Sequence, residues 1–305
     1  MSNSTCVSKQ LTWPPLVKIV LSTYTGLLLG LGLLLNGLAL WVFCSRMRRW
    51  TETRIYMVNL AVADFCLLCA IPFFLHSLKE RTTDTPFCQV SQGAYLANRY
   101  MSICLVTAIA VDRYVAVQHP LRARALRSPR QAAAVCAALW ALVGGLLGLR
   151  WALGMQEGGF CFSNASRQSS NTMFFSLLGF FLPLAVLVFC SLRVVTALGQ
   201  RPTASPDQAE ATRRATRMVW ANLAVFVVCF LPIHVVLMVV VATSLNTSAI
   251  CYALVITGKL SDANCCLDAI CYYFMAEDFQ EASSLASMPI AKAHRNENSL
   301  SVTLA

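Results

Sequence analysis

The stretch VKIVLSTYTGLLLGLGLLLNGLALWVFC, from Val17 to Cys44, is almost entirely apolar and carries one charged residue, Lys18. About 20 consecutive apolar residues in a helix are enough to cross the hydrocarbon core of a bilayer. The stretch therefore predicts a membrane-spanning helix. Six more runs of this kind follow along the chain: Ile55–Leu78, Phe87–Val117, Ala132–Trp151, Met173–Leu198, Arg217–Thr243 and Cys251–Met275.

The composition agrees with a membrane as the solvent. Of the 305 residues, 57% are hydrophobic and 12% are charged, whereas soluble domains have roughly 45–50% and 25%. Each run is far longer than the strand of a membrane barrel, and a helix satisfies its backbone polar groups within the span. We expect an all-α membrane protein, a seven-transmembrane helix bundle over residues 17–275. The net charge of +10 lies in short arginine clusters between apolar runs, so no nucleic-acid partner is expected.

Basic residues and glycosylation signals predict the orientation. Arginines gather on the side that holds the C-terminus, and basic loops face the cytoplasm. They are Arg46, Arg48, Arg49, Arg54, Arg122, Arg124, Arg127, Arg130, Arg201, Arg213, Arg214 and Arg217. The N-x-S/T sequons at Asn3, Asn164 and Asn246 all fall on the opposite side. We expect a plasma-membrane protein with residues 1–16 extracellular and the C-terminus cytoplasmic. Residues 1–10 lack the apolar core of a cleaved signal peptide, so the first span is expected to act as a signal anchor.

The residues after the bundle divide into two parts. Residues 276–286 predict a short amphipathic eighth helix at the interface, with Phe279 and Leu285 toward lipid. No cysteine follows Cys271, so a palmitoyl anchor is not expected there. Residues 287–305 are polar and predict a disordered cytoplasmic tail, which is either phosphorylated or simply solvated. The candidate phosphorylation sites are Ser283, Ser284, Ser287, Ser299, Ser301 and Thr303.

Charged residues inside the spans are costly and are functional candidates. They are Asp64, Arg99, Asp262 and Asp268 at depth, with Lys259 and Arg150 nearer the outer ends. On the third span, Tyr95 and Arg113 are about five turns apart and share a face with Arg99 and Ser102. Arg99 and Arg113 are about 21 Å apart at 1.5 Å per residue. A ligand at the outer end can therefore affect a partner at the inner end only through a conformational change.

Motifs in each of the seven spans resemble those of the rhodopsin-like (class A) G-protein-coupled receptors. They are Asn36, Leu60–Asp64, Asp112–Tyr114, Trp140, Pro183, Phe226 with Cys229–Pro232, and Asp268–Tyr272. The stretches Trp50–Met57 and Leu260–Tyr273 further resemble a kynurenic-acid-responsive branch of the class. The resemblance implies a receptor, not an enzyme, that answers tryptophan-derived acids or lysophosphatidic acid. It also implies arrestin and G proteins of the inhibitory and twelve/thirteen families as partners.

The resemblance assigns disulfides among the 14 cysteines. Cys88 is expected to pair with Cys161, the alternative being two free thiols on the oxidising side of the membrane. Cys6 and Cys251 are expected to form a second bridge. Most of the other cysteines lie inside apolar runs and are expected to pack as small hydrophobes, including the C-x-x-C stretch Cys66–Cys69.

The resemblance also assigns two clusters inside the bundle. Four residues match the sodium pocket of the class: Asp64, Ser102, Asn264 and Asp268. Another set matches the switch that meets the G protein: Asp112, Arg113 and Tyr114, with Phe226, Phe230 and Tyr272. Arg113 alone could also be an arginine that extends to the membrane interface. No cofactor is expected beyond an allosteric Na⁺.

The outer part of the third span predicts the ligand. Tyr95 stands where amine receptors carry an aspartate, so an ammonium ligand would lack its counter-charge. Arg99 follows one turn deeper, and Arg150 and Arg167 lie above it. Guanidinium groups bind carboxylates and phosphates through two parallel hydrogen bonds. We expect a small, aromatic acid packed on Tyr95. The alternative is that Asp262 neutralises Arg99 and that Arg99 has a structural role. Both interpretations hold together if Asp262 binds Arg99 in the resting state and an acidic ligand displaces it.

Three positions depart from the pattern of the class. Phe230 replaces the tryptophan of the switch in the sixth span, so the indole N–H is missing. Thr212 replaces an acid that would hold Arg113 in the resting state, which predicts measurable basal signalling. Lys259 lies about a turn above the lysine position of opsins, so retinal is not expected.

Two other classes of protein fit the sequence less well. An enzyme needs a nucleophile with its base or a metal cluster, and the four histidines have no ligand spacing. A small-molecule or ion transporter is the stronger alternative. Transporters tend to have internal repeats with paired helix breaks, and Pro72, Pro183 and Pro232 show no such pairing.

Overall fold

The computed structural model describes residues 14–46, 50–80, 86–119, 127–152, 175–200, 206–243 and 247–271. The helices, in chain order, are α2 (Pro15–Trp41) with η1 (Val42–Arg46), α3 (Glu52–Glu80), α4 (Pro86–Gln118), α6 (Pro129–Ala152), η2 (Leu177–Phe181) with α8 (Leu182–Gly199), α9 (Pro206–Thr243) and α10 (Ser248–Asp262). After a turn at Ala263, helix resumes over 264–271.

Seven helical segments of the described chain are long and apolar enough to cross a membrane. The prediction of an all-α bundle with seven spans is therefore confirmed. The segments are Pro15–Ser45, Glu52–Phe73, Val90–Gln118, Pro129–Leu149, Leu177–Gly199, Gln208–Thr243 and Ser248–Cys271. The predicted interfacial helix over 276–286 and the tail over 287–305 lie outside the described residues.

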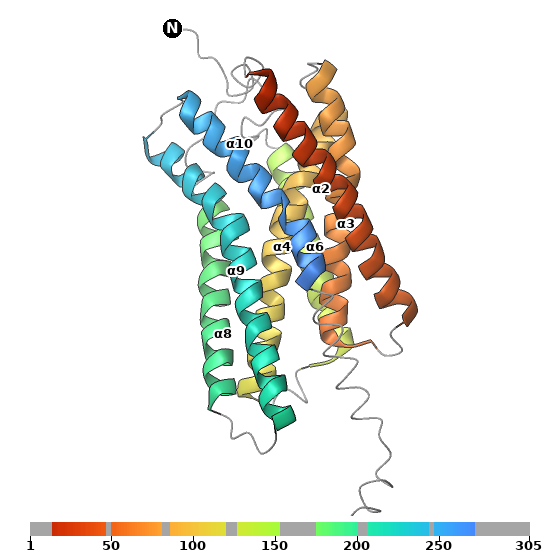
Figure 1. The fold of residues 1–305 in the computed structure, drawn as a ribbon, viewed down its shortest axis with the longest axis vertical. Helices are drawn as coiled ribbons and strands as arrows, with labels where there is room; N and C mark the ends of the chain where they lie inside the picture. Colours follow the sequence, from red (N-terminus) through yellow and green to blue (C-terminus); the bar gives the residue numbers. More distant parts are fainter. Residues whose placement is uncertain are drawn as a thin grey trace, which may run out of the picture.

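Helix α4 occupies the middle of the bundle. It packs against α3, α6, α8 and α9, and Figure 1 shows it between the α8–α9 pair on one flank and the α2–α3 pair on the other. Hydrogen bonds join α2 to α10 and to the helical segment that follows it. The Tyr24 hydroxyl donates to the backbone oxygen of Lys259 in α10 at 2.7 Å, and Asn36 Nδ2 donates to that of Cys265 in the following segment at 2.8 Å. This central position makes α4 the helix that lies along each polar cluster of the bundle.

The outer face of α2 shows why lipid is the solvent. Leu27, Leu31 and Leu34 are 61%, 52% and 66% exposed. In water, a continuous face of this kind would drive association, because monomeric soluble proteins rarely expose large apolar patches. In a bilayer the same side chains contact acyl chains.

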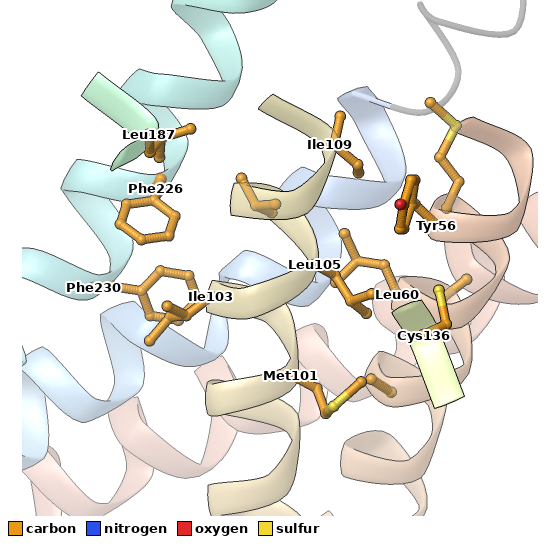
Figure 2. Close-up of a cluster of buried hydrophobic side chains, with 14 of the residues drawn as sticks. Tyr56, Leu60, Met101, Ile103, Leu105, Ile109, Cys136, Leu187, Phe226 and Phe230 are labelled. Carbon is orange, nitrogen blue, oxygen red and sulfur yellow. The ribbon is translucent and has the colours of Figure 1, made fainter. Parts of the chain in front are cut away.

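The apolar core lies where α3, α4 and α9 meet. Leu60, Ile103 and Phe230 are each at most 1% exposed, and Figure 2 shows the Phe230 ring beside Ile103. The Phe226 ring lies one turn away, with its centroid 5.4 Å from that of Phe230. Two aromatic residues of the predicted switch are thus part of the packed interior.

A π-helical turn precedes Pro183. The ring of Pro183 has no backbone N–H to donate to the preceding turn, and the turn Leu177–Phe181 is wound more loosely than an α-helix. Gly179 in this turn lies against Tyr100 of α4, since a Cβ there would be 2.9 Å from Cε1 of the tyrosine. The π-turn therefore brings the start of α8 close to α4.

Candidate functional site

The first polar cluster lies around Arg99 of α4, at the end expected to face outward. Its Nε donates to Oγ of Ser261 at 3.2 Å. Its Cζ atom is 5.5 Å from the centroid of the Tyr95 ring, within the range of a cation–π contact. The guanidinium is only partly exposed, and it has no ion pair with any carboxylate of the described residues.

Asp262, the acid predicted beside Arg99, has a different partner. Its Oδ2 is 3.5 Å from Nζ of Lys259, one helical turn earlier on α10. Asp262 is 4% exposed. The hydroxyl of Tyr24 donates to the backbone oxygen of Lys259 at 2.7 Å, which joins this turn to α2. In the structure, Asp262 therefore pairs with Lys259, and Arg99 contacts the hydroxyl of Ser261 and the ring of Tyr95.

His234 also belongs to this region, although no role was predicted for it from the sequence. It is 1% exposed, and its Nδ1 lies 2.8 Å from the carbonyl oxygen of Phe230. A carbonyl can only accept, so Nδ1 carries the proton. The ring stacks on Phe180 with centroids 4.0 Å apart, and Phe180 stacks on Phe226 at 5.7 Å. An aromatic column thus runs from His234 to the predicted switch. The sequence feature that could have indicated this role is the position of His234, two residues after Pro232 of the predicted switch motif.

The second cluster contains the four residues of the predicted sodium pocket. Ser102 and Asp64 are 0% exposed, Asn264 is 3% exposed and Asp268 is 5% exposed. Asn264 Nδ2 donates to Asp268 Oδ2 at 2.6 Å. Asn98, which the sequence interpretation missed, donates through Nδ2 to Asp64 Oδ1 at 2.9 Å.

Three oxygen atoms of this second cluster have no hydrogen-bond partner within the described structure. They are Oδ2 of Asp64, Oγ of Ser102 and Oδ1 of Asn264. Buried oxygens without a partner are rare in proteins and point to water or an ion. Carboxylate, hydroxyl and amide oxygens are the donors that hard cations prefer. The donor set therefore fits Na⁺.

The third cluster lies at the opposite end of α4. Arg127, just before α6, donates from Nε to Oδ1 and from Nη2 to Oδ2 of Asp112, both at 2.8 Å. Its Nη2 is also 3.7 Å from Oε2 of Glu52. Arg113 donates from Nη2 to the hydroxyl of Thr53 on α3, and Thr53 is 2% exposed. Two residues of the predicted switch, Asp112 and Arg113, are thus bound to the segment before α6 and to α3.

Tyr114 has aromatic rather than ionic neighbours. Its ring centroid is 5.7 Å from those of His119 and Phe189. Phe189 belongs to α8, so this contact fixes the end of α4 against α8. Thr212, where an acid was noted as missing, lies partly buried in α9.

The described residues give limited information on the remaining predicted sites. Cys251 is disulfide-bonded, in agreement with its predicted role, while its predicted partner Cys6 lies outside the described residues. The backbones of Cys88 and Arg150 lie in α4 and α6, but their side chains are not described. Also outside the described residues are Asn3, Cys161, Asn164, Arg167, Asn246, Tyr272, Ser283, Ser284, Ser287, Ser299, Ser301 and Thr303.

The seven membrane-length helices of the described residues define a multi-pass membrane protein. Residues 35–272 match the model of the 7 transmembrane receptor (rhodopsin family), and the chain belongs to this family. It is 69% identical to human G-protein coupled receptor 35, over 99% of this chain and 98% of that protein.

More distant relatives carry names that refer to acids. The chain is 33% identical to human lysophosphatidic acid receptor 4, over 83% of this chain and 73% of the relative. It is 36% identical to human hydroxycarboxylic acid receptor 2, over 85% and 75% of the two chains. These relatives are receptors rather than enzymes or transporters. The chain is accordingly a G-protein-coupled signalling receptor, with a ligand and a G protein as its partners.

Proposed function

We propose that this receptor is activated by small acids whose carboxylate or phosphate binds Arg99. The observation that carries the proposal is the state of the Arg99 guanidinium. It is largely enclosed by the bundle, has a serine hydroxyl and a tyrosine face as neighbours, and forms no ion pair within the described structure. A buried charge without a counter-charge is costly. An acid that enters from the Tyr95 end supplies that charge.

The arrangement of the nearby ion pair supports the same ligand class. Because Lys259 binds Asp262, the acid of α10 is not available to neutralise Arg99. Tyr95 offers an aromatic surface next to the guanidinium. Tryptophan-derived acids combine a carboxylate with an aromatic ring, and lysophosphatidic acid presents a phosphate. Both kinds of ligand suit this pair of residues. The names of the relatives, which refer to lysophosphatidic and hydroxycarboxylic acids, support the same ligand class. Arg150 and Arg167 are proposed to add charge at the entrance.

The receptor is proposed to act at the plasma membrane with its N-terminus outside. The arginine clusters of the connecting segments support this orientation, since basic loops remain in the cytoplasm. The Arg113 end then faces heterotrimeric G proteins of the inhibitory and twelve/thirteen families, and arrestin after phosphorylation of the tail.

Sodium is proposed to bind between the two ends. Asp64, Ser102, Asn264 and Asp268 would hold the ion, which would supply positive charge to two buried carboxylates. The three oxygens without hydrogen-bond partners support this assignment. Asp268 and Asn264 belong to the segment that follows the turn at Ala263, so a bound ion would fix that segment against α3 and α4.

Agonist potency in cells tests the ligand proposal. Kynurenic acid and a lysophosphatidic acid are applied to the wild type and to the Arg99→Ala, Arg99→Lys and Arg150→Ala variants at matched surface expression. A hydrogen-bonded charge contributes about 1.5–3 kcal/mol, so Arg99→Ala is expected to lower potency by about 10- to 100-fold. Lysine keeps the positive charge but lacks the two parallel N–H donors of a guanidinium. The agonist potency at Arg99→Lys should therefore lie between those at the wild type and at Arg99→Ala. Unchanged potency of both acids at Arg99→Ala and Arg150→Ala would refute the proposal.

A further inference from the structure

His234 of α9 uses one of its two ring nitrogens in the described structure. Its Nδ1 donates to the backbone oxygen of Phe230 at 2.8 Å, whereas Nε2 has no hydrogen-bond partner among the described residues. The side chain is 1% exposed. Buried polar atoms are hydrogen-bonded in the great majority of cases. Nε2 is therefore an unused hydrogen-bonding atom inside the bundle.

The surroundings of the His234 ring fix the direction of this nitrogen. Nδ1 faces the backbone of α9, and Phe180 covers one face of the ring, with centroids 4.0 Å apart and planes 8° apart. Because the ring is buried, the edge opposite Nδ1 points into the bundle rather than toward lipid. The guanidinium of Arg99 on α4 is close enough to act on the ring electrostatically. Nε2 therefore lies beside the proposed anion site.

The hydrogen bond of Nδ1 determines what Nε2 can bind. Nδ1 carries the proton because it faces a carbonyl, and the other nitrogen of a neutral imidazole is an acceptor. A second buried positive charge next to Arg99 would be costly, so the neutral ring is the stable form. An acceptor cannot bind a carboxylate oxygen, but it can bind an N–H or O–H group. Arg99 and His234 thus suit two different groups of one ligand.

We propose that His234 determines the specificity of the ligand site, because its Nε2 accepts a hydrogen bond from an N–H or O–H group of the acid bound at Arg99. The inference rests on the proposed function and narrows its ligand class to aromatic acids that carry such a donor. A site with a buried acceptor discriminates against an analogue without the donor, since the acceptor then stays unpaired.

A purely structural role for His234 is the alternative. The ring stacks on Phe180, which stacks on Phe226 with centroids 5.7 Å apart. This column needs an aromatic ring at position 234 but does not need Nε2. The substitution His234→Phe therefore keeps a ring in the column and removes the acceptor, which allows the two roles to be separated.

Competition binding to the purified receptor in nanodiscs tests the inference with two acids. Kynurenic acid carries one N–H or O–H donor in either of its tautomers, and quinoline-2-carboxylic acid has the same ring system and carboxylate without that donor. The preference of the wild type for kynurenic acid should fall about two- to tenfold in His234→Phe, as expected for one neutral hydrogen bond. His234→Gln, whose side-chain oxygen also accepts, should keep part of the preference. Indole-3-acetic acid and its N-methyl derivative form a second pair that differs in one N–H group.

Two further variants make the outcomes distinct. Val235→Ala is the matched control, because Val235 follows His234 in α9 but is 44% exposed, and it should keep the wild-type preference. An equal loss of affinity for both acids of a pair in His234→Phe would show a structural role and overturn the inference, as would an unchanged preference. Arg99→Ala should weaken both acids alike. Undiminished binding of both acids to Arg99→Ala would instead count against the proposed function.

Discussion

Arg99 and Arg113 are arginines of the same helix, and each donates to a hydroxyl group. Arg99 donates to Ser261 and Arg113 donates to Thr53. A hydroxyl satisfies one N–H of a guanidinium but supplies no negative charge. At the residue scale, Arg99 therefore carries a charge that an incoming anion can neutralise.

Ser261 competes with an acidic ligand for Arg99. Substitution Ser261→Ala removes the acceptor, and the ligand no longer has to displace it. Since a hydrogen bond contributes about 0.5–1.5 kcal/mol net, the affinity for kynurenic acid should increase by about two- to tenfold in a radioligand competition assay. Ser248→Ala, at the exposed first residue of α10, serves as the control. A decreased affinity in Ser261→Ala would show that the serine supports binding instead.

Asp64 is predicted to make agonist binding sensitive to sodium. An ion fixed among Asp64, Ser102 and Asp268 would favour the resting arrangement, so NaCl should lower agonist affinity relative to N-methylglucamine chloride at equal ionic strength. In Asp64→Asn the difference between the two salts should disappear, because the amide carries no charge. A wild-type receptor with equal affinity in both salts would contradict the sodium assignment.

At the scale of elements, close helix contacts depend on small residues. A Cβ on Gly32 of α2 would be 2.7 Å from Cδ2 of Leu68 on α3, whereas nothing lies within 4 Å of a Cβ on Gly30. Overpacking of this kind costs typically 1–3 kcal/mol. Gly32→Ala should therefore lower the melting temperature of the detergent-solubilised receptor by several degrees, and Gly30→Ala should not. If Gly32→Ala had the melting temperature of the wild type, Leu68 would be able to move aside without cost.

The spans were predictable because lipid imposes length and apolarity on every one of them. The predicted Val17–Cys44 agrees with the observed Pro15–Ser45. Local departures from regular helix were not predicted. The π-helical turn Leu177–Phe181 and the turn at Ala263 depend on contacts with neighbouring helices, such as that of Gly179 with Tyr100, which sequence periodicity does not report.

The polar sites were predictable in part. Asp64, Ser102, Asn264 and Asp268 were predicted from the resemblance, and all four are buried. The partners within each cluster were not: Asn98 binds Asp64, Lys259 binds Asp262 and Arg127 binds Asp112. Each of these pairs depends on side-chain direction and on the competition between neighbouring charges, and these are fixed only when the helices pack.

At the scale of the whole molecule, α4 connects the three polar clusters. Arg99, Ser102 and Arg113 lie along it, and α3, α6, α8 and α9 pack around it. The aromatic column from His234 through Phe180 to Phe226 runs alongside. A shift of Arg99 toward a ligand would act on Ser261 of α10, two residues before the turn at Ala263. We infer that this contact starts the change that reaches Arg113.

The central claim is that an anion bound at Arg99 increases nucleotide exchange on a G protein at the other end of the bundle. The most direct measurement uses purified receptor in nanodiscs with an inhibitory G protein, and compares kynurenic acid with its uncharged primary amide. The acid should accelerate exchange in the wild type, the amide should not, and neither should act on Arg99→Ala. Equal acceleration by the acid and the amide, or an undiminished response in Arg99→Ala, would contradict the claim.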